Sequence, residues 1–353
     1  MLTALMRGAL IGVVALIQLK LPAPIPVEPV SGILDGFKTH SLVALSEPHG
    51  NEQAHALRLK LIRDPRFPSL VDDIVMEAGN ARYQNLIDRF INGESVSDSE
   101  LRHVWQDIVS PGPTGDLPIY EDFYRAVRAL NQGLPKQRRL RVLLADPPID
   151  WSQVRSGDDL VKWGLQRDVH TADVIMREVV AKKRRALLIF GEGHLWRRNP
   201  RSNFDRDDLP GPFVGILARA GAPRVFTIST APVDIMDLSK LIDVQAWPVP
   251  GFALLHGTTL GGMDFAAFAP ASGRYVMRDG KRIDIPREQW RVIPMEEQFD
   301  ALLYLGPRSG FSQSRIPAAL CADPSYLPMR LARMALVGQP SDALKQHCAS
   351  FQR

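Results

Sequence analysis

Acidic and imidazole side chains follow four short apolar runs of this chain. The first run ends in Glu47-Pro48-His49, the second in Glu77, the third in Asp146 and the fourth in Gly191-Glu192-Gly193-His194. Carboxylates and neutral imidazoles can exchange protons with water, or they can ligate a divalent metal ion. The pattern therefore indicates either a hydrolytic site or a metal site.

These side chains can act together only if the fold brings the ends of the runs together. The runs are continuous rather than alternating, as strands buried on both faces of a sheet must be. We predict six strands, at Ser41–Leu45, Asp73–Met76, Leu140–Ala145, Ala186–Phe190, Arg224–Ile228 and Ala301–Leu305. Helical patterns at Glu52–Arg63 and Arg167–Lys183 separate them. Strands that alternate with helices predict an α/β fold, with a largely parallel, doubly wound sheet flanked by helices.

Parallel strands place their carboxyl ends at one edge of the sheet, where ligands bind. Neighbouring strands lie about 4.8 Å apart, so side chains at their ends can share a pocket. A lone acid after a strand is most often a helix cap, but four coincidences favour a common site. Its expected members are Glu47, His49, Glu77 and His194. For Asp146, capping the turn at Pro147-Pro148 is an equal alternative.

Two acids and two imidazoles have two chemical uses, and the residues alone leave both open. In the first, Glu47, His49, Glu77 and His194 ligate Zn, Mn or Fe. In the second, a neutral imidazole takes a proton from water and a carboxylate stabilises the resulting imidazolium. Arg167, expected at the start of the helix that leads into the fourth strand, would favour the second use by holding a developing oxyanion.

The rest of the chain is expected to form a single α/β domain over residues 31–353. It would carry a helical insertion at 80–137, which we expect to cap the edge of the sheet, and a loop-rich insertion at 231–295. In the latter, Tyr275–Ile283 predicts a hairpin with an Asp279-Gly280 turn. His55, on the amphipathic helix after the first strand, is expected to face solvent.

The N-terminus predicts a secretory signal peptide or an uncleaved anchor in residues 1–30. Arg7 precedes the apolar run Gly8–Leu19, and a proline-rich stretch follows. At about 1.5 Å per residue this run is too short to cross the hydrocarbon core of a bilayer. We therefore expect an extracytoplasmic protein, periplasmic or secreted. It would contact the membrane only through this segment, if the segment is retained.

Composition and motifs exclude several classes of protein. The net charge of +4 is diffuse, and the densest basic cluster is Lys182-Lys183-Arg184-Arg185, so we expect no nucleic-acid binding. The chain contains no Gly-x-Ser-x-Gly, His-Glu-x-x-His or phosphate-binding-loop motif, which argues against a common serine hydrolase. Cys321 and Cys348 could staple a C-terminal helical hairpin in an oxidising compartment, or they could remain two free thiols.

The strand-end motifs, taken in order, resemble a known superfamily. They are Glu47-Pro48-His49-Gly50, Glu77, Arg167-Asp168 and Gly191-Glu192-Gly193-His194. They are similar to those of the superfamily that contains erythromycin esterases, haem-binding uptake proteins of the ChaN type and Tiki/TraB-like proteins. The resemblance covers about residues 38–196.

The esterase members imply that His49 activates water while Glu47, Glu77, His194 and Arg167 line the cleft. The substrate would be a small molecule or a peptide. The single residue between Glu47 and His49 is more similar to the haem-binding branch, which implies haem or iron uptake without turnover. The Tiki-like members imply a metal-dependent peptidase. An esterase-like hydrolase is the leading prediction, and these two functions are its alternatives.

Overall fold

A computed structural model describes most of the chain. The described residues are 21–198, 211–230, 244, 246–265, 275–278, 281–286, 289 and 292–351. Most of the expected leader, much of the 231–295 segment and the expected Asp279-Gly280 turn lie outside them. Within the described ranges, no helix combines the length and the apolar character needed to cross a membrane.

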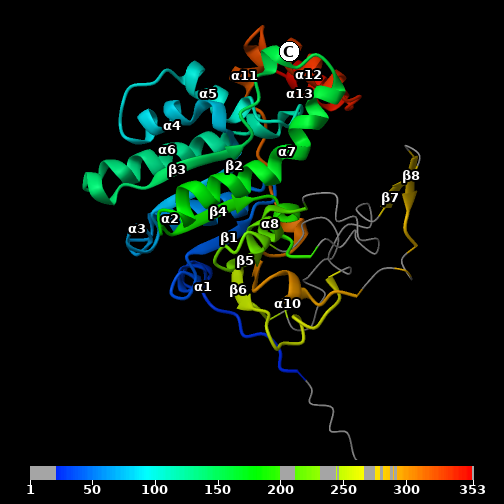
Figure 1. The fold of residues 1–353 in the computed structure, drawn as a ribbon. Coiled ribbons are helices and arrows are strands. Elements are labelled where there is room, and N and C mark those ends of the chain that lie inside the picture. The colour runs from blue at the N-terminus through cyan, green and yellow to red at the C-terminus, as the bar shows by residue number, and fades with distance from the viewer. Residues whose placement is uncertain are drawn as a thin grey trace, which may run out of the picture.

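The core is a seven-stranded sheet in the order β3-β2-β4-β1-β5-β9-β6 (Figure 1). The strands are β1 (Leu42–Ser46), β2 (Asp73–Asn80), β3 (Arg141–Asp146), β4 (Ala186–Phe190), β5 (Val225–Ser229), β6 (Gly251–Leu254) and β9 (Ala301–Tyr304). All neighbours pair in parallel except β6, which runs antiparallel to β9. The predicted α/β fold and its six strands are confirmed, and β6 is the strand that sequence reasoning missed.

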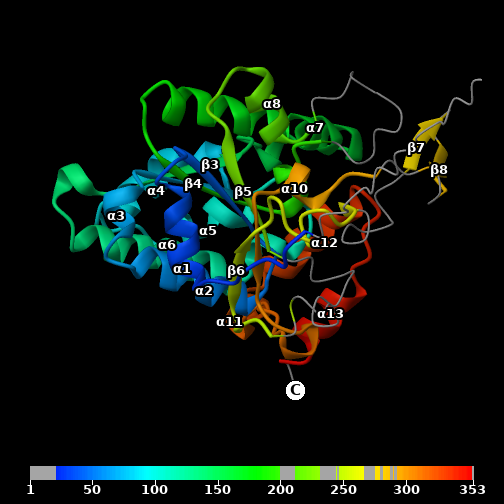
Figure 2. The same cartoon turned by 90° about the horizontal axis from the view of Figure 1, so that it is seen from below.

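Helices cover both faces of the sheet, and Figure 2 shows the resulting three layers. One face carries α1 (Pro29–Gly36), α2 (Glu52–Arg63), α4 (Gln84–Ile91), α5 (Asp98–Gln106) and α6 (Pro118–Gln132), and the other carries α7 (Gly157–Ile175) and α8 (Phe213–Arg219). Successive residues of a strand point to opposite faces. In β1, Val43 and Leu45 join the first apolar cluster, whereas Leu42 and Ala44 join the second.

Helices α4 to α6 form the connection from β2 to β3, within the segment expected to cap the sheet edge. That expectation is wrong, because their apolar residues pack on the face of the sheet. Phe123, Tyr124 and Trp105 are buried in the same cluster as Ile74 and Met76 of β2. The segment therefore forms part of one helical layer of the core, together with α1 and α2, and is not an addition to the edge of the sheet.

Helix α7 begins earlier than the apolar pattern predicted. Ser156 and Asp159 form a capping box, in which the side chain of each residue accepts a hydrogen bond from the backbone N–H of the other. The helix therefore starts at Gly157, and Arg167 lies inside it rather than at its start. After Ile175 the chain continues as one π-helical turn, Met176–Val180.

The folded part of the chain begins before residue 30, so the boundary expected there is corrected. Val27 pairs with Phe252 of β6 through two backbone hydrogen bonds of 2.7 and 3.1 Å. Glu28 then caps α1, and Pro29 occupies its first turn. Val30 is 2% exposed and belongs to the core.

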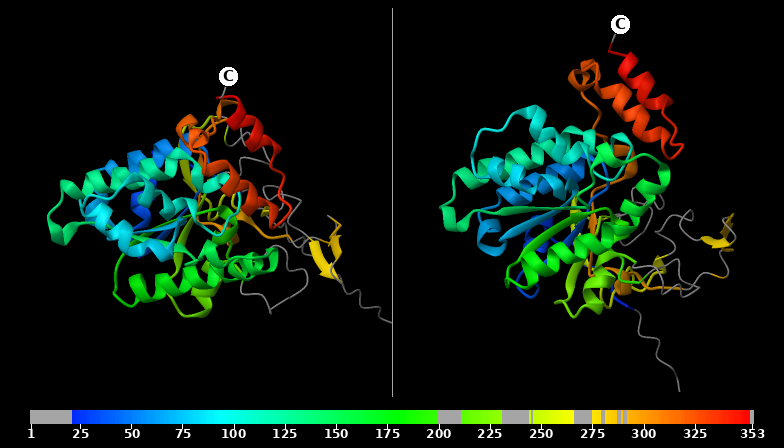
Figure 3. Two further views of the ribbon diagram at one scale, coloured as in Figure 1. Left: turned by 90° about the horizontal axis from the view of Figure 1, so that it is seen from above. Right: turned by 45° about the horizontal axis from the view of Figure 1, so that its top comes forward.

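The described C-terminal segment forms α11 (Ala318–Ala322), α12 (Tyr326–Ala335) and α13 (Asp342–Ala349), seen at the top of Figure 3 (right). A disulfide joins Cys321 to Cys348, which settles the open alternative. Arg330, fully buried, forms a bidentate ion pair with Asp116 and docks this unit on the segment before α6. The remaining described strands and α-helices are the β7–β8 hairpin (Tyr275–Arg278 and Lys281–Asp284), as predicted, and the short α3 (Phe67–Leu70) and α10 (Met295–Gln298).

Candidate functional site

The predicted site residues lie at the carboxyl ends of four adjacent strands. Glu47 follows β1, Glu77 lies in β2, Asp146 ends β3 and His194 lies in a short 3₁₀ turn after β4. Because β3, β2, β4 and β1 are neighbours in the sheet, their carboxyl ends form one continuous edge. Arg167 reaches the same edge from α7.

Glu77 connects most of the cluster. Arg167 Nη2 donates to Glu77 Oε1 at 3.0 Å, and His194 Nε2 lies 3.4 Å from the same oxygen. The backbone N–H of Gly191 donates to Glu77 Oε2 at 2.5 Å. Burial favours the neutral carboxyl, but the charge and hydrogen bond of His194 and the charges of His49 and Arg167 hold the pKa of Glu77 well below its usual value. Glu77 is therefore a fixed negative charge.

His49 and Glu47 form a second pair beside Glu77. His49 Nδ1 lies 2.6 Å from Glu47 Oε2, and the His49 side chain is 45% exposed whereas that of Glu47 is 4% exposed. Burial disfavours the imidazolium, yet the hydrogen bond to Glu47 and the charge of Glu77 raise the pKa of His49 to about 9. A β-carbon at Gly191 would lie 3.2 Å from His49 Nε2, so the glycine allows this close approach.

Asp146 belongs to the cluster, which answers the question left open by the sequence. It accepts hydrogen bonds from Arg167 Nε at 2.9 Å and from the backbone N–H of Val109 at 2.5 Å. Burial raises the pKa of Asp146 to about 6, although the Arg167 charge opposes the shift. Arg167 thus bridges two carboxylates and is held in place by both.

Asp168 is a site residue to which sequence reasoning gave no role. Its Oδ1 lies 2.8 Å from His194 Nδ1 and also accepts a hydrogen bond from the backbone N–H of Phe213. Burial disfavours the charged ring, but the charge of Glu77 and the hydrogen bond to Asp168 raise the pKa of His194 to about 10. The sequence feature that could have indicated Asp168 is its position beside Arg167 in the Arg167-Asp168 motif.

Arg58 and Tyr120 were also missed. Tyr120 donates to Glu47 Oε2 at 3.3 Å, and Arg58 Nη1 lies 3.5 Å from Glu47 Oε1. Among the described atoms, neither Glu47 Oε1 nor Arg58 Nη1 has a hydrogen-bond partner. A cavity of about 10 Å³, with room for roughly one water molecule, adjoins them. Arg58 could have been identified from the sequence, because it is a charged residue on the otherwise apolar stripe of α2 that contains Ala54 and Leu61.

Glu192, between Gly191 and His194, forms a separate hydrogen-bonded group with two serines. Its Oε2 accepts hydrogen bonds from Ser229 at 2.7 Å and Ser46 at 3.5 Å. Burial raises the pKa of Glu192 to about 7, and the two hydroxyls only partly offset this shift. Glu192, which follows β4, therefore places a partly buried acid with a raised pKa against the carboxyl ends of β1 and β5, where Ser46 and Ser229 lie.

His55 was expected to face solvent, and this expectation is wrong. Its side chain is buried, and its Nε2 approaches only the Asp122 carboxylate, at 4.0 Å. Burial and the neighbouring Arg58 charge lower the pKa of His55 to about 4, so the ring is neutral. Helix α2 packs against α6 as well as the sheet, and this second contact covers a position that helical periodicity alone places outside.

Ion pairs hold the side chains of the cluster in place. Nδ1 of each imidazole faces a carboxylate, and the guanidinium groups of Arg58 and Arg167 face Glu47 and Glu77. Within the described part of the chain, no group of three or more His, Cys, Asp or Glu side chains is set out to hold a metal ion.

No protein-family model and no curated protein matches the chain. Solved structures to which it is similar include a succinoglycan biosynthesis protein, with a TM-score of 0.57 at 9% identity over 84% of this chain and 96% of that one. An erythromycin esterase matches with a TM-score of 0.49 at 13% identity over 81% and 94% of the two chains. The haem-binding ChaN of Campylobacter jejuni matches with 0.36 at 12% over 57% and 85%. An erythromycin esterase and a ChaN protein are thus among the structural neighbours of the chain. The likeness to the succinoglycan biosynthesis protein supports the α/β fold.

Proposed function

We propose that this chain hydrolyses an ester bond in a small-molecule or peptide substrate, with His49 as the group that takes the proton from water. The observation that supports this most directly is the His49–Glu47 pair. The imidazole is the accessible partner, and the buried carboxylate fixes its orientation through Nδ1. Such a base with an orienting acid is the usual arrangement for activating water.

The neighbouring cations suit the charge that ester hydrolysis creates. His49 Nε2 would accept a proton while the water oxygen attacks the carbonyl carbon. The oxyanion formed would lie near Arg167 and His194, both of which are held by carboxylates. When the tetrahedral intermediate collapses, the C–O bond to the alcohol breaks. His49 then returns its proton to the leaving alkoxide.

The protonation state of His49 sets the pH dependence of this reaction. Only the neutral ring accepts a proton, and a pKa of about 9 leaves a small neutral fraction at pH 7. Turnover should therefore rise with pH and level off above about pH 9. At neutral pH the paired imidazolium would instead favour binding of an anionic group of the substrate.

The test is ester turnover by the purified chain and its His49→Gln variant, on a panel that includes para-nitrophenyl acetate. We expect kcat/KM to fall at least ~10²-fold, the usual contribution of a positioned base. His256→Gln, which changes a 94% exposed side chain, is the matched control and should leave turnover unchanged. Equal turnover by His49→Gln and the parent, both folded by circular dichroism, would refute the proposal.

Haem binding is the second candidate, because an exposed imidazole such as His49 can serve as an axial ligand. Titration of haem into the same two proteins separates the candidates. A Soret band that shifts in His49→Gln, without ester turnover in the parent, would favour uptake. Metal content measured in the same preparations tests the peptidase alternative, since a stoichiometric metal lost in Glu77→Gln would support it.

We also propose an extracytoplasmic location for the chain. The Cys321–Cys348 disulfide supports this, because such bonds persist in oxidising compartments. The apolar run after Arg7 is the accompanying sequence feature. Fractionation of expressing cells should place the protein in the periplasm or the medium. Recovery of the protein with fully reduced thiols from the cytoplasm would contradict the proposal.

A further inference from the structure

A basic groove lies at the amino ends of β2 and β3, opposite the carboxyl ends that carry the candidate site. It encloses about 280 Å³, near the lower end of the volumes of small-molecule sites. Its charged lining is five basic residues and one acid, namely Lys136, Arg138, Arg139, Arg141, Arg184 and Asp72. This groove shares no lining residue with the candidate hydrolytic site.

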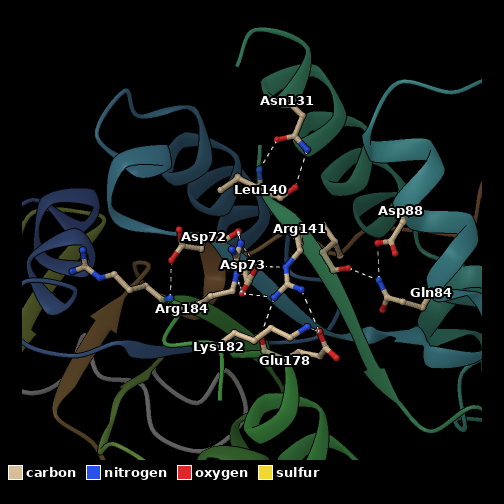
Figure 4. Close-up of polar contacts among 12 residues, drawn as sticks. Asp72, Asp73, Gln84, Asp88, Asn131, Leu140, Arg141, Glu178, Lys182 and Arg184 are labelled. Carbon is tan, nitrogen blue, oxygen red and sulfur yellow. Dashed lines mark hydrogen bonds and ion pairs between the residues drawn. The ribbon is translucent and has the colours of Figure 1, made fainter. Parts of the chain in front are cut away.

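Two of the arginines form a rigid floor, which Figure 4 shows around Asp73. Arg141 donates to Asp73 from Nε at 2.8 Å and from Nη2 at 2.9 Å. Arg184 donates to the same carboxylate from Nε at 2.7 Å and from Nη2 at 2.8 Å. Asp73 is fully buried, so both guanidinium groups are fixed relative to the strands.

The other three basic residues form a rim whose charge is not neutralised. Among the described residues, none of Lys136, Arg138 and Arg139 has a carboxylate within ion-pair distance. Arg138 Nη2 donates to the carbonyl of Pro68 at 3.0 Å, and Arg139 Nη1 donates to that of Asn92 at 3.2 Å. Arg139 Nε is buried and, within the described structure, has no hydrogen-bond acceptor.

We propose that this groove binds a small solute through a phosphoryl or pyrophosphoryl group. A buried donor without an acceptor is unfavourable, and an anion supplied by a ligand would satisfy it. Planar guanidinium groups match the oxygens of a phosphoryl group in pairs, and four such groups line one groove here. The free charges of the rim would balance the two or more negative charges of the ligand.

The shape of the groove favours a small solute over a membrane or a nucleic acid. Pro68 and Asn92 also line the groove, so the cations face a limited volume of about 280 Å³. Acidic residues lie close by: Glu178 pairs with both Arg141 and Lys182, and Asp72 lies in the lining itself. These acids interrupt the basic surface that a polyanion or a lipid headgroup layer would need.

Isothermal titration of the full chain with sodium pyrophosphate at low ionic strength tests this proposal. We expect saturable binding that weakens at least ~30-fold in Arg138→Gln/Arg139→Gln, because each lost charge-assisted contact is worth about tenfold. The control Lys162→Gln/Lys345→Gln removes the same charge from side chains 72% and 51% exposed elsewhere, and should change Kd less than twofold.

Arg139 also bonds the loop after α4, so a second variant guards against misfolding. Lys136→Gln/Arg138→Gln changes exposed residues and should likewise weaken binding at least ~30-fold at unchanged Tm. The proposal is overturned if the parent protein does not bind pyrophosphate, or if both variants bind as the parent does. It is also overturned if only vesicles containing phosphatidic acid bind.

Discussion

The two ends of β2 and β3 carry similar residues in different arrangements. At their amino ends, Asp73 is fully buried and four guanidinium nitrogens satisfy it. At their carboxyl ends, Glu77 and Asp146 also share an arginine, but Glu77 in addition contacts the His194 imidazole. Both ends are thus ion-pair clusters on the same two strands.

The difference lies in which groups titrate and which remain reachable. Arginine does not change charge in the physiological range, so the Asp73 cluster holds the strands together at every ordinary pH. The carboxyl-end cluster contains His49, exposed by 45%, and next to it a buried oxygen of Glu47 that accepts no hydrogen bond from any described residue. A cluster that only stabilises can be closed and complete, whereas one that reacts must keep a proton and an atom accessible.

The largest expected effect is on activity at the carboxyl end. Glu77→Gln removes the charge that orients Arg167 and His194. We expect ester kcat/KM to fall about 10³-fold, since preorganised cations at an oxyanion are each worth ~10²-fold or more. Kinetics on the same ester panel measure this. If kcat/KM of a folded Glu77→Gln variant fell less than tenfold, Glu77 would have no role in ester hydrolysis.

The next effect is on stability at the amino end. Asp73→Asn removes the buried charge that Arg141 and Arg184 share, so that Arg184 loses this carboxylate and Arg141 retains Glu178. Breaking a buried pair costs about 3–5 kcal/mol. Urea unfolding should show this loss, while the kcat/KM of the remaining folded protein stays within a factor of about three. If turnover fell as far as in Glu77→Gln, the two clusters would not be functionally distinct.

A smaller effect concerns the pH profile. Glu47→Gln removes the hydrogen-bonded charge that raises the pKa of His49, so the pH at which turnover rises should move down from about 9. A shift of about one pH unit or more is expected for the loss of an opposite charge in contact. The maximal rate should fall as well, because the ring loses its orienting partner. A profile that keeps its midpoint would assign the rise to another group.

The smallest effect is at Gly191. A methyl group there would meet His49 Nε2 at 3.2 Å and Glu77 Oε2 at 3.3 Å, so one of them must move by a few tenths of an ångström. Gly191→Ala should therefore lower turnover about tenfold with little change in Tm, because small misplacements of reacting groups are costly. Gly193→Ala is the control, since nothing lies within 4 Å of its added carbon.

Much of the fold and part of the site could be predicted from the sequence. Helix Glu52–Arg63 and strand Ala186–Phe190 have the predicted bounds, because caps and continuous apolar runs are local signals. The convergence of Glu47, His49, Glu77 and His194 followed from strand ends, and that of Arg167 from its place on the helix before the fourth strand. The catalytic roles of these residues stay predictions.

The remainder depended on packing between distant elements. Tyr120 reaches Glu47 only because α6 packs on α2, and His55 is buried by the same contact. Strand β6 is four residues long and gains its partners from β9 and Val27, so its own sequence carried little signal. The Pro29 start of α1 was likewise hidden in a stretch that resembles the end of a leader.

The placement of His194 between Glu77 and Asp168, together with that of His49, couples folding to proton binding. Both rings have pKa values raised above the ordinary value of about 6.5, to about 10 and about 9. Their stabilisation is complete below pH 6.5 and is lost as pH rises through the folded values. At pH 8 the chain therefore takes up about two protons from the buffer when it folds. The enthalpy of unfolding at that pH should consequently vary with the ionisation enthalpy of the buffer chosen.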